Sequence, residues 1–413
     1  MKILLINNFH YRLGGSETVY FNTADLLREH GHEVLFFSQT RKMNIACDQE
    51  DFFSEAIDFN SHGLVKKLKG VIQYFYNFNA ARSLEKLILK EKPDVAHIHL
   101  LWGGLGGAIL KELKKYNVPI VYSVHEYRMV CPAYTFKDGN NKVCELCGSG
   151  AYWHCLQKKC CKGDYLLSMI MALEMYFRNT FLHPAKYVDT FIFVSKFCKN
   201  IHLKFDKRFE NTQSAVLYNF CNSDVLKYKN GMLDTYHNYF LFYGRLSFEK
   251  GIVTLIKAFS SFPHLNLKIV GKGPQEEMLK ELCEKERITN VDFLGFKSGK
   301  ELYDLVEKAK FVCVPSEWYE NNPMTIVEAY SLNTPVLGAD IGGISEIIID
   351  GVTGFLHRSG SVNDISRKLS LISSLSELDY QRLKNSAFSF ARDNFDRERY
   401  YEQLVNIYLK VVR

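Results

Sequence analysis

The sequence contains no apolar run that approaches the roughly 18 residues a helix needs to cross a membrane. Its opening, MKILLINNFHY, has the pattern of a strand followed by a polar loop and lacks the pattern of a secretory signal peptide. These two absences argue against a membrane-spanning or an exported protein. We therefore expect a cytoplasmic protein.

A strong charge of either sign is also missing. The 52 Lys and Arg residues and the 46 Asp and Glu residues leave a formal net charge of +6, which is compatible with anionic ligands, nucleic acid or an anionic membrane and selects none of them. We expect no nucleic acid among the partners. The chain does have size, because 413 residues with 47% hydrophobic content can build two cores, which predicts two domains.

Short apolar strands alternate with helical patterns, and this alternation is typical of a parallel sheet covered by helices on both faces. In the first half we expect strands at 2–6, 33–38, 94–100, 119–125 and 190–195, separated by helical patterns at 16–30, 64–91, 104–116 and 164–182. In the second half we expect strands at 239–244, 265–271, 291–296, 311–316, 335–340 and 354–357. The predicted fold class is α/β, with a doubly wound parallel sheet in each of two domains that face across a cleft.

We place the first domain at 1–205, the second at 206–395 and a C-terminal helix at 396–413. Helical spacing near the C-terminus predicts four partly buried side chains. They are Tyr400, Leu404, Ile407 and Leu409. Spacing leaves open whether this helix packs on the second domain or returns to the first.

Two glutamates, Glu320 and Glu328, lie in the stretch ENNPMTIVEAYSLNTPVL, which follows an apolar strand. Pro323 predicts a loop that turns into a helix, and the first backbone N–H groups of that helix, those of Met324 and Thr325, suit a phosphate. Carboxylates accept hydrogen bonds from pairs of hydroxyl groups and therefore suit a sugar. The alternative for Glu328 is an ordinary solvated position on the helix.

Arg245 and Lys250 lie five residues apart in GRLSFEKG, between a strand and a helix. Both cationic groups could reach a diphosphate beyond the strand end, where Arg offers a planar fork and Lys a point charge. The alternative is a solvated charge pair with Glu249.

Glycines stand at two further strand ends. Gly14 and Gly15 allow a tight turn at a helix N-terminus, where a phosphate fits, although a plain turn with Ser16 as the N-cap explains them as well. Gly271 and Gly273, in VGKGP, would clear room at the end of a second-domain strand or only form a turn.

His125 ends the strand PIVYSVH and so falls at the carboxyl edge of the first sheet. This position favours a functional role. A buried histidine with purely structural hydrogen bonds is the alternative.

Six of the eleven cysteines lie within 131–161, in a predicted insertion. A cytoplasmic location disfavours structural disulfides. Four thiolates would suit a structural zinc, with His154 as a substitute ligand, whereas the irregular spacing of the later cysteines favours small buried thiols without a metal. The predicted zinc ligands are Cys144, Cys147, Cys155 and Cys160.

The segment 64–92 interleaves lysines with apolar residues. Such a stretch can lie on an anionic membrane surface, and an ordinary surface helix with its apolar face on the core explains the same pattern. The lysines are Lys66, Lys67, Lys69, Lys86, Lys90 and Lys92.

Five motifs follow one another along nearly the whole chain: GGSE, SVHEYRMVCP, YGRLSFEKG, VGKGP, and an E-x7-E stretch followed by TPVLGADIGGISEII. In this order and spacing they resemble the group 1, or family 4, retaining glycosyltransferases. The resemblance implies the GT-B architecture, in which both doubly wound domains are Rossmann-like. It also implies a nucleotide-diphosphate-sugar donor held mainly by the second domain and a saccharide or polyprenyl-linked acceptor held mainly by the first.

The resemblance implies roles for single residues. His125 would hydrogen-bond the transferred sugar, and Arg245 and Lys250 would stabilise the leaving diphosphate. Glu320 would contact hydroxyl groups of the sugar and Glu328 the ribose. The remaining predicted donor-binding residues are Gly15, Gly271, Gly273, Asn321, Asn322, Met324 and Thr325. Glu126 stands where many members have Asp, which affects any acceptor contact at that position.

The expected function is that of a retaining hexosyltransferase, of the EC 2.4 class, in the synthesis of a surface polysaccharide at the inner face of the membrane. In this family the acceptor attacks on the face from which the diphosphate leaves, instead of through a carboxylate nucleophile as in many glycosidases. Because the cations replace a metal, we expect no cofactor for catalysis. The alternative function is a catalytically inactive sugar-nucleotide-binding or scaffolding protein on the same fold.

Overall fold

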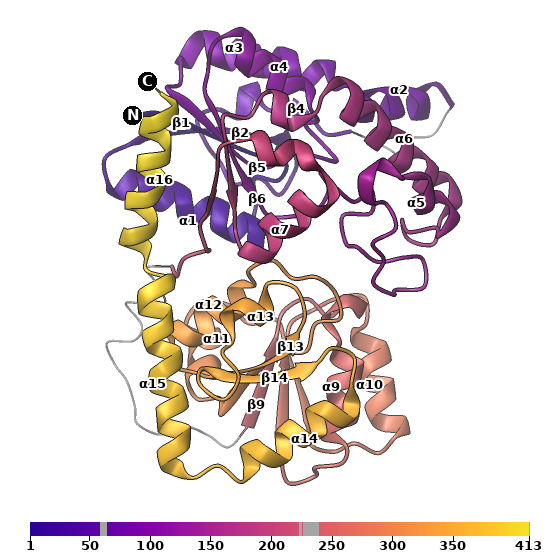
Figure 1. Ribbon diagram of the computed structural model, residues 1–413, viewed down its shortest axis with the longest axis vertical. Coiled ribbons are helices and arrows are strands. Elements are labelled where there is room, and N and C mark those ends of the chain that lie inside the picture. The colour runs from indigo at the N-terminus through magenta and orange to yellow at the C-terminus, as the bar shows by residue number, and fades with distance from the viewer. Residues whose placement is uncertain (58–63, 223–224, 226–238, 413) are drawn as a thin grey trace. The chain divides into compact units, whose positions relative to one another are not determined.

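The computed structural model describes residues 1–57, 64–222, 225 and 239–412. The chain forms two compact units (Figure 1), one made of Met1–Leu217 with Glu398–Arg413 and the other of Tyr218–Arg397. Within the described residues, each unit is built on a six-stranded parallel sheet.

The first sheet has the strand order β2-β1-β5-β6-β7-β8, and all its neighbouring strands are parallel. Most of its residues are buried, as expected for a sheet with helices on both faces. The strands are β1 (Lys2–Asn7), β2 (Glu33–Phe37), β5 (Val95–Leu100), β6 (Ile120–Val124), β7 (Thr190–Phe193) and β8 (Ser214–Val216). A small parallel pair, β3 (Gln39–Thr40) and β4 (Ser54–Glu55), lies in the same unit.

In Figure 1, α3 and α4 lie in the upper part of the first unit and α1 lies in its lower part. The helical pattern predicted at 64–91 is two helices, because the side chain of Asn77 accepts a hydrogen bond from the backbone N–H of Ala80 and starts a new helix there. The helices are α1 (Gly15–Glu29), α2 (Leu64–Phe75), α3 (Phe78–Glu91), α4 (Ala108–Lys115), α5 (Trp153–Gln157), α6 (Tyr165–Phe181), α7 (Lys196–Phe205) and α16 (Arg397–Val411).

The predicted boundary at 205 falls too early. Strand β8 pairs with β7 and therefore belongs to the first sheet, so that this unit continues to Leu217. The boundary was placed wrongly because β8 is only three residues long and follows β7 after a single helix and a turn.

The last helix, α16, packs on the first unit. The hydroxyl group of Tyr408 lies 2.7 Å from His97 Nδ1 on β5, and that of Tyr401 lies 2.8 Å from His32 Nε2. Tyr400, Leu404 and Tyr408 are buried at intervals of four residues. The prediction of a partly buried Leu409 is wrong, since this side chain is 46% exposed while its neighbour Tyr408 fills the contact.

The second sheet has the order β11-β10-β9-β12-β13-β14 and is parallel throughout. Its strands are β9 (Tyr239–Tyr243), β10 (Asn266–Val270), β11 (Val291–Gly295), β12 (Phe311–Val314), β13 (Val336–Asp340) and β14 (Gly354–Arg358). The surrounding helices are α9 (Ile252–Phe259), α10 (Glu276–Lys285), α11 (Gly299–Glu307), α12 (Met324–Ser331), α13 (Ile344–Ile347), α14 (Val362–Ser373) and α15 (Glu377–Asn394). A core of aliphatic and aromatic side chains joins this sheet to α9, α10, α14 and α15. The six strands predicted for the second half are confirmed.

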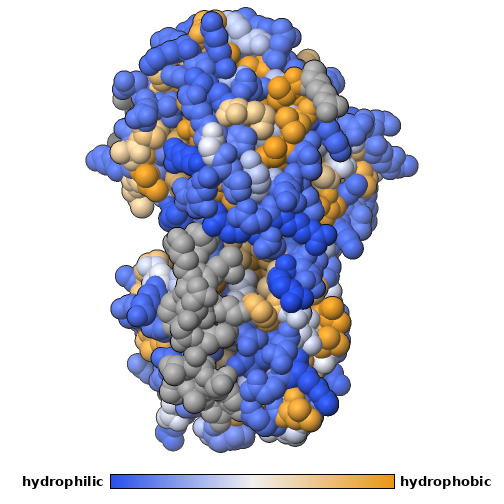
Figure 2. Space-filling model, turned by 90° about the vertical axis from the view of Figure 1, so that its left-hand side faces the viewer, coloured by the Kyte–Doolittle hydropathy of each residue, from blue (hydrophilic) through white to orange (hydrophobic). Residues whose placement is uncertain are grey.

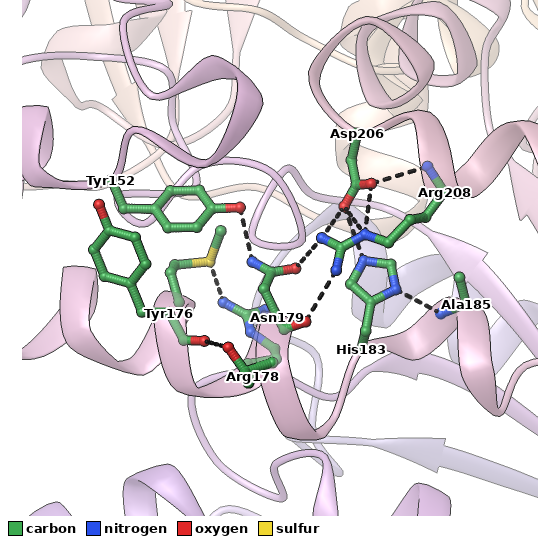
Figure 3. Close-up of polar contacts among 10 residues, drawn as sticks. Tyr152, Tyr176, Arg178, Asn179, His183, Ala185, Asp206 and Arg208 are labelled. Atoms are coloured by element: carbon green, nitrogen blue, oxygen red, sulfur yellow. Dashed lines mark hydrogen bonds and ion pairs between the residues drawn. The ribbon is translucent and has the colours of Figure 1, made fainter.

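The cysteine-rich insertion between β6 and α6 has little regular structure apart from α5. A polar network fastens it to the rest of the first unit (Figure 3). Asn179 on α6 donates to the hydroxyl group of Tyr152 at 2.7 Å and accepts from Arg208 Nη2 at 2.8 Å. Arg208 also donates to the carboxylate of Asp206, which lies 2.9 Å from His183 Nε2. Side-chain hydrogen bonds thus hold a segment that helices and strands do not.

Candidate functional site

The predicted donor-binding residues of the second unit follow the carboxyl ends of neighbouring strands. Strand β9 lies between β10 and β12, so the strand order reverses direction there. Such reversal points are where doubly wound sheets bind ligands, because the loops on either side diverge. The segments after β9 and β12 carry Lys250 and Glu320.

Lys250 and Glu320 form an ion pair, with 2.6 Å between Nζ and Oε1. Ser316 Oγ donates to the same carboxylate oxygen at 2.9 Å. Glu320 is only 7% exposed. Burial opposes its ionised form, but the charge and hydrogen bond of Lys250 outweigh burial and hold the pKa of Glu320 below its usual value. The site therefore contains a charged carboxylate, and the alternative pairing of Lys250 with Glu249 is wrong.

Two loops approach closely to make this pair. Gly251 has a φ of 68°, and a Cβ there would lie 2.1 Å from the carbonyl oxygen of Pro315. The backbone N–H of Glu317 donates to the carbonyl of Glu249 at 2.8 Å. Arg245, five residues before Lys250 in the segment after β9, is exposed at the same edge of the sheet.

Glu328 lies on α12 beneath the same edge. The hydroxyl group of Tyr243, the last residue of β9, lies 3.1 Å from Glu328 Oε2 and 2.9 Å from the carbonyl oxygen of Thr325. Burial raises the pKa of Glu328 to about 7, and the hydrogen bond from Tyr243 only partly offsets it. Glu328 is thus a partly buried acid near the start of α12 and not an ordinary solvated residue.

The predicted loop-to-helix boundary is confirmed, since α12 begins at Met324 directly after Pro323. The preceding asparagines differ from one another. Asn322 is buried, and its side-chain oxygen accepts a 2.9 Å hydrogen bond from the backbone N–H of Asn219. Asn322 therefore joins two segments of the second unit, and its predicted donor contact stays a prediction, as does that of Asn321.

The sequence reasoning assigned no role to Gly342 and Gly343, which position the Glu320 loop. The backbone N–H of Gly343 donates to the carbonyl of Glu320 at 2.7 Å. A Cβ on Gly343 would lie 1.6 Å from the carbonyl oxygen of Asn321, and Gly342 has a φ of 62°. The pair of glycines in GADIGGISE was the available signal, because adjacent glycines after a strand mark a close backbone approach.

Gly271 and Gly273 allow the loops after β9 and β10 to touch. A Cβ on Gly273 would lie 2.3 Å from the carbonyl oxygen of Leu246, and one on Gly271 would lie 1.9 Å from that of Gly244. Leu246 in turn donates to the carbonyl of Lys272 at 3.0 Å. These glycines thus shape the segment that carries Arg245.

In the first unit, α1 begins at Gly15, directly after the extended Gly14. The carboxylate of Glu17 occupies the first turn, where Ser16 Oγ donates to it at 3.2 Å, and burial raises the pKa of Glu17. A phosphate at this helix start would meet a carboxylate already in place. The predicted donor contact of Gly15 stays a prediction.

His125 directly follows β6, as predicted, and is half-buried. Its Nε2 lies 3.0 Å from Nδ1 of His99, which sits near the end of β5. Burial lowers the pKa of His125 to about 4, so the ring is neutral at neutral pH.

The cysteines of the insertion gather around Cys155, whose sulfur lies 3.8 Å from that of Cys161. Within the part of the chain that the structure describes, no set of three or more His, Cys, Asp or Glu side chains is arranged to hold a metal ion. The predicted ligands Cys144, Cys147, Cys155 and Cys160 are thus not assembled as a finished site, and the zinc stays a prediction.

Comparison with protein families decides the assignment. The family described as Glycosyltransferase Family 4 matches residues 13–225, and the family Glycosyl transferases group 1 matches residues 229–389. The chain belongs to the group 1, family 4 glycosyltransferases. This glycosyltransferase is accordingly a transferase enzyme.

Relatives cover the same length. The glycosyltransferase is 26% identical over 370 residues to an uncharacterized glycosyltransferase of Methanocaldococcus jannaschii, covering 89% of this chain and 87% of the relative. Its fold is similar to that of sucrose-phosphate synthase from Thermosynechococcus elongatus, with a TM-score of 0.71, 18% identity and coverage of 99% and 98%. It is also similar to Anabaena HepE, solved in complex with UDP and glucose, with a TM-score of 0.65, 18% identity and coverage of 98% and 99%. The predicted GT-B class, with two Rossmann-like domains, is confirmed.

Proposed function

We propose that this glycosyltransferase transfers a hexose, with retention of configuration, from a nucleotide-diphosphate sugar to a saccharide or lipid-linked saccharide acceptor. The observation that carries the proposal is the ion pair between Lys250 and Glu320 at the reversal point of the second sheet. It combines a cation suited to a diphosphate with an ionised carboxylate suited to sugar hydroxyl groups.

In the proposed reaction the acceptor hydroxyl oxygen forms a bond to the anomeric carbon while the bond from that carbon to the diphosphate oxygen breaks. The acceptor's proton passes to the leaving oxygen on the same face. Negative charge grows on the diphosphate, and Lys250, Arg245 and the N–H groups at the start of α12 would stabilise it. The complex of Anabaena HepE with UDP and glucose supports uridine as the first nucleotide to test.

A lipid-linked acceptor of a surface polysaccharide fits exposed apolar side chains on α2 and α6, two helices that pack together in the first unit. Leu68 and Ile72 on α2 are 59% and 52% exposed, and Leu166 and Leu173 on α6 are 60% and 50% exposed. On α2 these residues point outward, which favours the membrane interpretation of segment 64–92 over core packing. The side chains of Lys66 and Lys67 lie outside the described residues.

Three exposed lysines, Lys158, Lys159 and Lys162, directly precede α6. Basic and apolar side chains together suit an anionic bilayer surface. The view from the side away from α6, in Figure 2, shows mostly polar residues with small hydrophobic groups between them. None of the described helices combines the length and the apolarity needed to span a bilayer, so we propose peripheral attachment.

The donor is tested by thermal unfolding with UDP, GDP, ADP and their sugars. A ligand at about a hundred times its dissociation constant stabilises the protein by about 2.7 kcal/mol. We expect one nucleotide to raise the midpoint, and we expect Lys250→Met and Arg245→Ala to lose that rise. Lys257→Met, an exposed lysine on α9, is the matched control and should keep it. An unchanged rise in Lys250→Met would refute the assignment of the diphosphate site.

Membrane attachment is tested by sedimentation with vesicles of phosphatidylglycerol and phosphatidylcholine at about 0.15 M salt. We expect binding that the double variant Leu166→Ser/Leu173→Ser loses. Leu371→Ser on α14, also an exposed leucine, should bind as before. If the unmodified protein does not sediment with these vesicles, the proposed membrane attachment is wrong.

A further inference from the structure

Two histidines, His99 and His125, meet near the carboxyl ends of β5 and β6. His99 Nδ1 and His125 Nε2 are 3.0 Å apart, and their rings are nearly parallel, with an angle of 10° between their planes. Two imidazole nitrogens at this distance share one hydrogen atom, so one ring donates and the other accepts. If His99 donates, neutral His125 carries its proton on Nδ1. If His125 donates, it carries its proton on Nε2.

The surroundings of His99 indicate which ring donates. His99 is fully buried, and its other nitrogen, Nε2, has no hydrogen-bond partner among the described residues. With the proton on Nε2, His99 would bury an N–H group without an acceptor. With the proton on Nδ1, Nε2 of His99 instead carries a lone pair that accepts no hydrogen bond. Buried N–H groups without an acceptor are rarer in folded proteins than buried acceptors without a donor. The geometry therefore favours donation from His99 Nδ1 to His125 Nε2.

His97, two residues before His99, does not compete for this hydrogen bond. Its Nδ1 lies 2.7 Å from the hydroxyl group of Tyr408 and its Nε2 lies 2.8 Å from Ser123 Oγ. Burial lowers the pKa of His97 to about 3 and that of His125 to about 4, and it lowers the pKa of His99 as well. All three rings are thus neutral at neutral pH, and each carries a single N–H group.

We propose that His99 is a positioning residue that holds His125 in the tautomer with its proton on Nδ1. The proton of His125 is then on Nδ1, and Nε2 is the acceptor of the hydrogen bond from His99. This role rests on the proposed sugar transfer and on the contact with the transferred sugar that the family resemblance implies for His125. The tautomer itself is a property of the first unit and can be measured without any substrate.

The position of the ring proton is measured by ¹H–¹⁵N correlation spectra of the full-length protein labelled with ¹⁵N-histidine. The signals of His125 are assigned as those that are absent from the spectrum of His125→Gln. We expect the proton of His125 on Nδ1 in the unmodified protein. We expect a shift toward Nε2 in His99→Leu, which has no donor, and retention of Nδ1 in His99→Asn, whose amide nitrogen falls near the position of Nδ1. A proton on Nε2 of His125 in the unmodified protein would overturn the proposal, whether or not the variants fold.

Transfer kinetics supply the second readout. Losing one defined hydrogen bond to the reacting sugar should lower kcat about tenfold in His99→Leu, and His99→Asn should recover most of it. His97→Leu removes an equally buried histidine from the same strand and should leave the tautomer of His125 unchanged. A changed tautomer with unchanged kcat in His99→Leu would overturn the catalytic part. If no nucleotide sugar is a substrate, the proposed function fails while the tautomer result stands.

Discussion

At the residue scale, Lys250 and Glu320 form their ion pair although 70 positions separate them in the chain. Each could be predicted from the sequence, because each follows an apolar strand and a turn. Their pairing could not, since it requires β9 and β12 to be neighbours, and the order of strands along the chain leaves this open. The contact between His99 and His125 was missed for the same reason, because it joins two strand ends.

Glu328 gives a residue-scale prediction. Its pKa of about 7 means that the carboxyl group loses its charge as the pH falls through neutrality. If the ionised form binds the ribose, the apparent dissociation constant of the nucleotide should increase about tenfold between pH 8 and pH 6. Isothermal titration calorimetry at several pH values measures this change.

The control is Glu328→Gln, which keeps the shape of the side chain but cannot ionise. It should bind more weakly at pH 8, and any pH dependence left in it belongs to the phosphates of the ligand. Parallel pH profiles in Glu328→Gln and the unmodified protein would contradict a role for the carboxylate.

At the scale of elements, strands and long helices were predictable while the insertion was not. Strand β12 is a fully buried apolar run, and this pattern is visible in the sequence. Strand β5 is also fully buried, although it contains two histidines. The insertion depends instead on single side chains such as Asn179 and Arg208, whose partners lie 27 and 29 positions away. No local pattern encodes such contacts.

The zinc in this insertion is an element-scale prediction. The sulfurs of Cys155 and Cys161, of which only Cys155 is among the predicted ligands, lie 3.8 Å apart. This is close to the edge of a tetrahedron with zinc–sulfur bonds of about 2.3 Å. Hydrogen bonding to Cys160 and Cys161 raises the pKa of Cys155 and lowers the pKa of those two, so the thiols share protons that a metal ion would displace. We expect about one zinc per chain by mass spectrometry after purification without chelators.

We expect Cys155→Ser to lose the zinc and Cys47→Ser to retain it. This comparison shows whether the zinc is bound by the insertion or by other thiols. Cys47 is partly exposed and lies outside the insertion. Unmodified protein that contains no zinc and shows six reactive thiols in the insertion after unfolding would rule the metal out.

At the scale of the whole molecule, the two units should respond differently to acid. Burial lowers the pKa of His10, His97, His125 and His202, all in the first unit, to between about 3 and about 4. Between pH 6.5 and pH 4 the unfolded chain binds protons that the folded unit does not. The free energy of unfolding of the first unit therefore decreases as the pH is lowered. Three acids with raised pKa values, Glu17, Glu126 and Glu174, oppose this trend but are fewer than these four histidines.

In the second unit the raised pKa of Glu328 has the opposite sign, because the folded state there binds the extra proton. We expect the unfolding midpoint of the first unit to fall by about 4 °C or more between pH 7.5 and pH 5.5, and that of the second unit to change less. Trp102 and Trp153 lie in the first unit and Trp318 in the second. In Trp318→Phe the remaining tryptophan fluorescence reports on unfolding of the first unit. In the double variant Trp102→Phe/Trp153→Phe it reports on unfolding of the second. Equal shifts in both reporters would contradict the assignment.

The position of Tyr408 under β5 has a consequence for synthesis on the ribosome. Residues 1–217 emerge first, yet the side chain that covers His97 emerges almost 200 positions later, with α16. The second unit can finish folding while the first still waits for its final helix. A nascent chain stalled before α16 would lack the buried side chains of Tyr400, Leu404 and Tyr408. We therefore expect chaperones to engage the first unit while the chain is still being translated.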